Sequence, residues 1–354
     1  MPPATHFVKT VKLQASIKTP APSVKKQTGG VKMSVRKRAF LFLLFIIPVI
    51  LLAACRPDVS GGENDGKKNI RFGYQKFGIM TILKAEGTLD ERLKKLGYDV
   101  VWTEFPGGPQ MLEALNAGSI DFGATGEAPP IFAQAAGAPI VYFANEPENP
   151  RGEAIVVPKN SPIQTVSDLK GKRIALNKGS NVHYLLVRAL EEAGLDYDDV
   201  ETVFLPPSDA RVAFEKGSVD AWAIWDPFLA DAEFHAGARQ IADGTNLVDN
   251  REFFLATKSL AKEHPDVLEA IFEELERIEV KMEKNQAEIA EFLSPQVGIG
   301  ADVLEAVLAR RRYGVERTSA ETLRDQQKIA DKFYDLGLIP ERINISEASL
   351  EAVK

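Results

Sequence analysis

Two stretches of the sequence repeat one pattern of residue types about a hundred residues apart, at 118–129 and 217–228. Each reads glycine, serine, a β-branched residue and aspartate, and continues with a short apolar run and an acid near proline. The matched acids are Asp121 with Asp220 and Glu127 with Asp226. A helix-like and a strand-like segment precede each stretch, so residues 68–137 and 171–237 look like two copies of one α/β unit. Two copies are too few for a solenoid, and we therefore expect two similar lobes that face each other.

Strand patterns such as 70–74 alternate with helical patterns such as Met80–Leu96 through both copies. This alternation is typical of parallel β-α-β units, so we expect an α/β fold with a doubly wound, mainly parallel sheet in each lobe. Strands at 154–157 and 253–257 should carry the chain across between the lobes.

The chain becomes wholly helical after the second crossing. In Asp266–Met282, apolar residues recur at steps of three and four opposite a face of Glu and Lys, which is typical of a helix that lies on a lobe. We expect the C-terminal helices to pack on the first lobe. The expected segments are a signal peptide at 1–54, a linker at 55–67, the first part of lobe 1 at 68–151, lobe 2 at 152–252, and the return to lobe 1 with the C-terminal helices at 253–354.

The first 54 residues have the composition of an export signal. They hold nine Lys and Arg and no Asp or Glu, and they end in sixteen residues, 39–54, without a charged or polar side chain. A basic region followed by an apolar run too short to span a bilayer comfortably indicates a signal peptide. Because Met33 would by itself begin a normal signal, we expect that translation starts there and not at Met1.

The end of the apolar run, Leu52-Ala53-Ala54-Cys55, resembles the lipobox of bacterial lipoproteins and holds the only cysteine of the chain. The resemblance implies cleavage before Cys55, acylation of that residue, and anchoring to the extracytoplasmic face of the cell membrane or in the periplasm. The polar, Gly-rich linker would then tether the folded part to the lipid. The alternative is a plain membrane anchor with an incidental cysteine.

Removal of residues 1–54 leaves 34 Lys and Arg against 50 Asp and Glu, a net charge of −16. A chain of this charge has no general attraction for nucleic acid. If the protein binds an anion, local hydrogen-bond donors and helix dipoles must hold it, because the overall field repels anions.

Ligands of open α/β sheets bind beyond the carboxyl ends of the strands, at helix N-termini. Three loops of the sequence take this position, at 74–78, 125–129 and 177–183. In the third loop, Lys178–Asn181 bring an ammonium group, a hydroxyl and free backbone N–H groups to the start of a long helix, as an anion site requires. The same residues could simply cap the helix. The spacing is not that of a Walker loop, so nothing supports binding of a Mg²⁺-nucleotide.

Trp222 and Trp225 fall on one predicted strand, where alternation should turn one indole into the core and the other toward a ligand. Glu127, Asp226 and His183 could form an acid–base set. Both acids stand at helix starts, however, where a carboxylate stabilises the helix dipole without any catalytic role. No metal-ligand spacing is present, so we expect a protein that is not an enzyme and has no cofactor or metal.

Within a likeness that covers about residues 68–345, a series of motifs stands at Thr125–Gly137, Asn160–Ile163, Val166–Gly171, Lys178–Ser180 and Ala221–Pro227. The series resembles the aliphatic-sulfonate-binding proteins of ABC uptake systems, within a larger group that includes taurine- and nitrate-binding relatives. The resemblance implies the two-lobed, hinged, type II fold of periplasmic binding proteins. It also implies capture of an alkanesulfonate between the lobes and its delivery to a permease with a cytoplasmic ATPase for sulfur uptake. We expect a monomer, because closure requires both lobes to move.

Carried over position by position, the resemblance implies ligand-facing residues in the strand-end loops. They are Gln75, Lys76, Gly126, Glu127, Lys178, Gly179, Ser180, Asn181, His183, Trp222, Trp225 and Asp226. A sulfonate stays ionised at physiological pH and only accepts hydrogen bonds, so its site should consist of donors. Either Arg311 or Arg312 could also reach the cleft.

The ligand stays open where the sequence departs from the family pattern, at Asn177, at 181–183 and at Glu127. The alternatives are taurine, nitrate or another small organic anion. Glu127 would separate them, because a zwitterion offers it an ammonium group that a simple alkanesulfonate lacks. Two further alternatives are an enzyme on this fold, such as a synthase of thiamine or pyrimidine precursors, and a sensor without its own permease.

Overall fold

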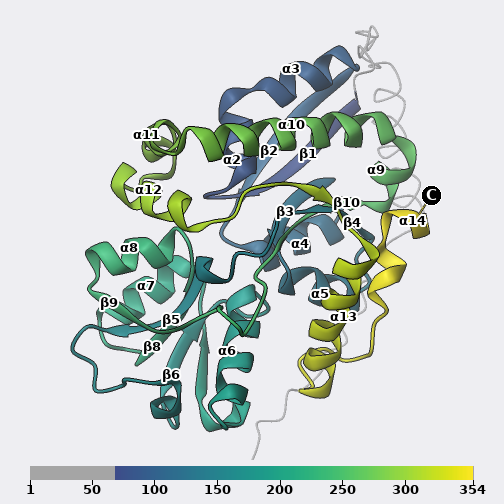
Figure 1. The fold of residues 1–354 in the computed structure, drawn as a ribbon. Coiled ribbons are helices and arrows are strands. Elements are labelled where there is room, and N and C mark those ends of the chain that lie inside the picture. Colours follow the sequence, from purple (N-terminus) through teal and green to yellow (C-terminus); the bar gives the residue numbers. More distant parts are fainter. Residues whose placement is uncertain (1–67, 354) are drawn as a thin grey trace, which may run out of the picture. The chain divides into compact units, whose positions relative to one another are not determined.

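The computed structural model describes residues 68–353, which all fall within one structural unit, Asp65–Lys354 (Figure 1). The predicted signal peptide, Cys55 with its lipobox, and the linker at 55–67 lie outside the described residues. Within the described part of the chain, no helix is long and apolar enough to cross a membrane.

The strands form two mixed sheets. The first consists of β1 (Lys68–Gln75), β2 (Tyr98–Phe105), β3 (Phe122–Gly126), β4 (Ile140–Asn145), β10 (Glu252–Thr257) and β11 (Glu316–Arg317), in the order β11-β4-β10-β3-β1-β2. The second consists of β5 (Glu153–Pro158), β6 (Arg173–Leu176), β7 (Glu201–Phe204), β8 (Ala221–Trp225) and β9 (Ala238–Asp243), in the order β7-β6-β8-β5-β9.

The two strands that carry the chain between the lobes, β5 and β10, explain why the sheets are mixed. In the first sheet, β1 pairs in parallel with β2 and β3, whereas β10 runs antiparallel to β3 and β4. In the second, β6 pairs in parallel with β7 and β8, whereas β5 runs antiparallel to β8 and β9. Most strands of each sheet therefore run one way, and the crossing strand, together with the short edge strand β11 in the first sheet, runs the other way.

The repeat in the sequence corresponds to one contact made in each sheet. In the first, Asp121 Oδ2 accepts the backbone N–H of Arg71 at 2.9 Å, and in the second, Asp220 Oδ2 accepts the N–H of Arg173 at 2.8 Å. In return, the N–H of each aspartate donates to the carbonyl of its arginine. The aspartate before the strand thus fixes the neighbouring strand in both lobes.

The helix predicted over Met80–Leu96 is in fact two helices, α2 (Ile79–Glu86) and α3 (Thr88–Lys95). Gly87 separates them with a left-handed backbone, φ 71°, which glycine adopts without a steric penalty. Its N–H donates to the Leu83 carbonyl and ends α2. Apolar residues of both helices enter the same core. The apolar periodicity therefore continues across Gly87, and the sequence pattern does not reveal the break.

Helices cover both faces of each sheet. They include α4 (Gly108–Asn116) and α5 (Ala128–Ala135) in the first lobe, and α6 (Asn181–Glu192), α7 (Pro207–Glu215) and α8 (Phe228–His235) in the second. One core of the first lobe contains apolar residues of α2, α3 and α10 (Pro265–Lys284), and another those of α4, α5 and α13 (Ala320–Asp335). In the second lobe, α6 packs in one core and α7 and α8 in the other. Each fully buried side chain of the size of Phe254 contributes about 1.5–3 kcal/mol to folding.

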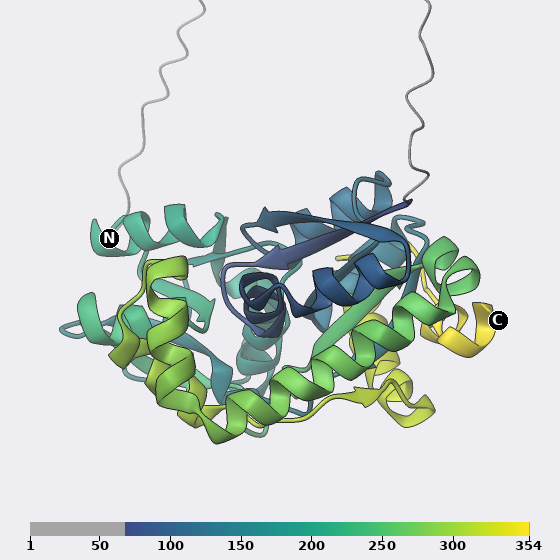
Figure 2. The same cartoon turned by 90° about the horizontal axis from the view of Figure 1, so that it is seen from above.

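The C-terminal helices lie on the first lobe and also reach the second. The remaining ones are α9 (Lys258–Glu263), α11 (Gln286–Val297), α12 (Ala301–Arg310) and α14 (Leu350–Val353), and the short 3-10 helices of the chain are η1 (Pro150–Gly152), η2 (Val166–Leu169), η3 (Tyr197–Asp199) and η4 (Ile345–Ala348). The long helix α10 lies alongside α2 and α3 (Figures 1 and 2). At the end of α12, Arg310 pairs with Asp226 of the second lobe at 3.1 Å, and Lys332 of α13 pairs with Glu191 at 2.7 Å.

Candidate ligand-binding site

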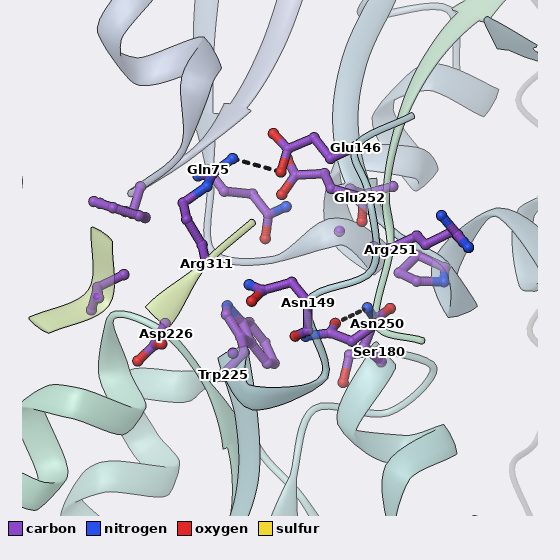
Figure 3. A pocket seen from close by; sticks show the side chains of 18 residues that line it. Gln75, Glu146, Asn149, Ser180, Trp225, Asp226, Asn250, Arg251, Glu252 and Arg311 are labelled. Carbon is purple, nitrogen blue, oxygen red and sulfur yellow. Dashed lines mark hydrogen bonds and ion pairs between the residues drawn. The ribbon is translucent and has the colours of Figure 1, made fainter. Parts of the chain in front are cut away.

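A cavity of about 110 Å³ lies where the two lobes and both crossings meet (Figure 3). The residues that line it come from strand ends of the first lobe, the crossings, the second lobe and the end of α12. They are Gln75, Phe77, Gly108, Thr125, Gly126, Pro129, Glu146, Asn149, Gly152, Ser180, Asn181, Trp225, Asp226, Asn250, Arg251, Glu252, Val307 and Arg311. The cavity thus lies beyond the carboxyl ends of β1, β3 and β8, as the fold class predicts.

Two helices begin at the cavity wall, α4 at Gly108 and α6 at Asn181. The N–H groups of a first helical turn have no acceptor within the helix, and the helix dipole adds partial positive charge there. Thr125, Asn149 and Trp225 add a hydroxyl, an amide and an indole N–H to the lining. This end of the cavity is therefore rich in donors and suited to an anion.

Asn181 joins the two lobes beside the cavity. Its Oδ1 accepts the backbone N–H of Ala128 in the first lobe at 3.1 Å, and its Nδ2 donates to Asn250 Oδ1 on the second crossing at 2.6 Å. Gly126 permits this approach, because a Cβ at that position would lie 2.2 Å from the Asn181 side chain. The lobes are in direct contact around the cavity in this conformation.

The residues of the predicted anion loop, Lys178–Asn181, line two different hollows of the structure. Ser180 and Asn181 line the cavity, whereas Lys178 and Gly179 line a separate groove that also includes Phe204. The Lys178 ammonium lies 5.4 Å from the centre of the Phe204 ring. The Ser180 hydroxyl donates to the Asn177 carbonyl at 2.6 Å, so it closes the turn before the helix. No side chain caps the first turn of α6, so the simple cap that the sequence left open is not formed, and only the second half of the predicted loop lines the cavity.

His183 does not reach the cavity, since it is fully buried where the second lobe packs against Phe132 and Phe333 of the first. Its Nδ1 accepts the backbone N–H of Gly179 at 3.2 Å, and its Nε2 lies 2.7 Å from the Tyr197 hydroxyl. Burial, with a further effect of Lys178, lowers the pKa of His183 to about 4. The ring is therefore neutral at physiological pH and holds the turn that leads into α6.

Glu127 lies behind the cavity wall and is 2% exposed. Its two carboxylate oxygens accept the backbone N–H groups of Asn250 and Arg251, at 3.1 and 3.0 Å. Burial raises the pKa of Glu127 to about 7, although these two hydrogen bonds oppose the rise. The side chain fastens the second crossing to the first lobe, and it does not face the cavity where an ammonium group could meet it.

The two tryptophans of β8 point in opposite directions, in keeping with the alternation along a strand. Trp222 is 1% exposed and packs against Phe214, whereas Trp225 lines the cavity. Beside Trp225, Asp226 accepts the N–H of Ala230 and pairs with Arg310. Burial raises the pKa of Asp226 to about 7, against the effect of Arg310.

In the first loop, Gln75 lines the cavity and donates to the Ala124 carbonyl at 3.1 Å, whereas Lys76 is not among the lining residues. Arg311 lines the cavity with a side chain that is 8% exposed. Arg312, in contrast, is 67% exposed and lies 3.6 Å from Glu148. Of the two arginines considered from the sequence, only Arg311 reaches the site.

Arg311 lies within a group of carboxylates. Its guanidinium pairs with Glu146 at 2.6 Å and with Glu279 at 3.1 Å. Glu252 stands next to them, and burial, with the nearby Glu146, raises the pKa of Glu252 to about 8. Among residues 68–353, no group of three or more His, Cys, Asp or Glu side chains is placed to hold a metal ion.

Comparison with known proteins identifies the family. A family model described as NMT1/THI5 like matches residues 93–289, more than half of the 354 residues. The chain belongs to the NMT1/THI5-like family. Its relatives include a protein of Escherichia coli (strain K12) named for binding aliphatic sulfonates, with 42% identity over 78% of this chain and 87% of that protein. A protein of Bacillus subtilis (strain 168) with the same name has 32% identity over 86% of this chain and 92% of its own.

A solved structure agrees with this membership. The alkanesulfonate-binding protein SsuA from Xanthomonas axonopodis pv. citri, bound to MOPS, has a TM-score of 0.77 and 40% identity, and the match covers 79% of this chain and 97% of that one. The α/β, two-lobed fold and the resemblance that the motifs carry are both confirmed for this NMT1/THI5-like protein.

The part of the site that lies on the crossings was not predicted from the sequence, namely Glu146, Asn149, Asn250 and Glu252. One signal could have found them. These residues flank the two strands predicted to cross between the lobes, and a crossing in a two-lobed fold must pass the cleft.

Proposed function

We propose that this NMT1/THI5-like protein is the solute-binding component of an ABC importer and captures an aliphatic sulfonate in the cavity between its lobes. The observation that carries the proposal is the convergence of two helix N-termini, one from each lobe, on a small cavity with further N–H and O–H donors. The close relatives named for binding sulfonates support the same reading.

The chemistry of a sulfonate fits such a lining. Its three oxygens carry one charge that does not titrate near neutral pH, so they accept hydrogen bonds and donate none. Donors in a water-poor cavity that both lobes close hold an anion more strongly than donors in open solvent. Phe77, Val307 and Trp225 give the same cavity apolar surface for a carbon chain.

A binding role agrees better with this lining than an enzymatic one. The Ser180 hydroxyl donates to a carbonyl, and His183, the histidine nearest to it in sequence, is committed to Gly179 and Tyr197. No nucleophile beside a base is formed at the cavity by these residues. Taurine, nitrate and other small organic anions remain the competing ligands of the same class. Turnover of any of them by the purified protein would favour an enzymatic function instead.

We further propose that the chain is exported and anchored through lipid on Cys55, acts as a monomer, and delivers its ligand to a permease with a cytoplasmic ATPase. The lipobox motif supports the anchor. Replacement of Cys55 by serine should release the protein from the membrane fraction. Retention in that fraction would contradict lipid anchoring.

The test of the proposed ligand is isothermal titration calorimetry on protein freed of carried ligand by partial unfolding and refolding. The titrants are a series of aliphatic sulfonates, with sulfate and nitrate as inorganic controls. We expect a one-to-one complex with a Kd of roughly micromolar or below for at least one sulfonate, about −8 kcal/mol or tighter. Tight nitrate or sulfate binding with no response to sulfonates would overturn the assignment.

A further inference from the structure

A buried carboxyl group at the boundary between the lobes is left without a partner. Glu153 begins β5, on the first crossing, and is 0% exposed. Neither of its carboxyl oxygens has a hydrogen-bond partner among residues 68–353. Glu153 stands opposite Trp225 in the antiparallel pair of β5 and β8, so both side chains lie on the same face of that sheet. Trp225 and Gly152 line the cavity, and Glu153 therefore lies next to it without facing it.

The charged group that acts on Glu153 belongs to the other lobe. It is Glu127, at the start of α5. Glu127 is 2% exposed, but both its oxygens accept backbone N–H groups of the second crossing, which stabilise its ionised form. Asp249 and Arg251 of that crossing and Tyr184 of α6 are the further titratable groups within reach of Glu127. Glu153 has no comparable donors, so its ionised form is not stabilised.

Glu153 must therefore hold a proton in this closed conformation. An unpaired carboxylate is strongly disfavoured when it is removed from water. Burial and the nearby Glu127 both raise the pKa of Glu153 well above its ordinary value. If Glu153 were ionised, two like charges from the two lobes would face each other in a site without water.

We propose that Glu153 couples ligand capture to proton uptake: closure of the lobes buries its carboxyl group beside Glu127 in the protonated form, and opening lets it ionise in water. The inference rests on the proposed function and adds a pH-sensitive step to the same cleft. Closure makes a contact beside the pair, since Asn181 Oδ1 accepts the N–H of Ala128, the residue after Glu127. An anion in the cavity adds another negative charge nearby, which acts in the same direction.

The direction of the pH dependence follows from the two states of Glu153. A glutamic acid in water has a pKa of about 4.3, whereas the pKa of Glu153 in the closed protein is raised. At a pH between these two values, the closed form binds one more proton than the open form. The contribution to ligand affinity is therefore complete below the lower value and is lost as the pH rises through the pKa of the closed form.

The test is calorimetry of the purified protein with an aliphatic sulfonate that binds, at pH 6, 7 and 8 and in buffers of different ionisation enthalpy. Because the sulfonate does not titrate in this range, any proton exchanged belongs to the protein. We expect uptake of about 0.5 to one proton for each ligand bound at pH 7, and a Kd that rises about three- to tenfold for each pH unit. Zero uptake with a constant Kd would overturn the inference and leave the proposed function intact.

Two substitutions of Glu153 locate the proton. Glu153→Gln replaces the carboxyl group with a neutral amide of nearly the same shape, and Glu153→Met replaces it with an apolar side chain of similar length if the amide is not accommodated. At pH 6 we expect a Kd within about threefold of that of the parent protein, with loss of both the proton uptake and the pH dependence. Glu269→Gln, at a largely exposed carboxylate paired with Arg317, is the matched control and should keep both.

Glu252→Gln tests a second buried acid, on the other crossing, whose pKa burial raises to about 8. This variant should keep the proton uptake of the parent protein. Uptake that survives the substitution of Glu153, or that disappears in Glu252→Gln instead, would overturn the inference. If no sulfonate binds to the parent protein, the proposed function itself fails, and the inference with it.

Discussion

Trp102 and Trp225 differ in whether the indole N–H is already hydrogen-bonded within the protein. Trp102 does not line the cavity, and its Nε1 donates to Asp90 at 3.1 Å, whereas the Trp225 indole lines the cavity and bonds to no other side chain of residues 68–353. Trp225→Phe should weaken sulfonate binding by about 10- to 100-fold, the worth of one hydrogen bond to a charged group. Trp102→Phe should leave the Kd unchanged in the same titration, and equal affinities for all three proteins would contradict a contact from Trp225.

Gly126 is the residue at which closure of the lobes depends on the absence of a side chain. The Cβ of Gly126→Ala would lie 2.2 Å from the Asn181 side chain, so the lobes must separate or Asn181 must turn away. We expect about tenfold weaker ligand binding with little change in stability, measured by calorimetry and by urea unfolding. Adding Asn181→Ala to Gly126→Ala removes the clash. The loss of binding free energy in the double variant should therefore be smaller than the sum of the losses in the two single variants. Strict additivity would show that the clash does not govern closure.

His183 should make folding stability depend on pH in a defined direction. Its pKa is about 4 in the fold and close to 6.5 when unfolded, so the unfolded chain binds the additional proton between these values. The stabilisation is therefore complete above pH 6.5 and is lost as the pH falls toward 4. In urea unfolding at several pH values, His183→Gln should be less stable at pH 7 and lose less between pH 6.5 and 4.5 than the parent protein. Identical slopes would contradict a buried neutral ring.

At the scale of elements, the repeated aspartates of the two lobes accept different numbers of hydrogen bonds. Asp121 accepts from the backbone N–H, the Nε and the Nη2 of Arg71, whereas Asp220 accepts only the backbone N–H of Arg173, whose guanidinium pairs with Glu201. Asp121→Asn should lower the free energy of unfolding by about 1.5–3 kcal/mol and Asp220→Asn by about 0.5–1.5 kcal/mol. Urea unfolding of both variants measures the difference, and a larger loss for Asp220→Asn would reverse the ranking of the two contacts.

The elements also show how far the sequence could go. Periodicity placed most strands, both crossing strands and the C-terminal helices, because each shows a regular apolar face. It could not show the break at Gly87, since α2 and α3 share one core. The sequence predicted that the loops after β1, β3 and β6 face the ligand. Side chains of one loop can point in different directions, however, and only some of them reach the cavity. Ser180 therefore lines the cavity, whereas Lys178 lies over Phe204.

At the scale of the whole molecule, the site depends on contacts between segments far apart in the sequence. Arg310 reaches Asp226 across the cleft, Asn181 reaches Ala128, and Arg311 meets carboxylates on β4 and α10. No local pattern carries this information, and the group of carboxylates around Arg311 could not be predicted. Closure of the lobes brings residues of both lobes around the cavity. By this hinge motion a two-lobed protein can hold a small ion out of water.

The most direct measurement of the proposed capture is a crystal structure of the protein grown with an aliphatic sulfonate that binds in calorimetry. We expect density for the sulfonate group at the N-termini of α4 and α6, within hydrogen-bond distance of donors from Thr125, Asn149 or Trp225, in a closed cavity. Density for the ligand elsewhere, such as the groove beside Lys178 and Phe204, or the sulfonate seated against Arg311 would contradict it.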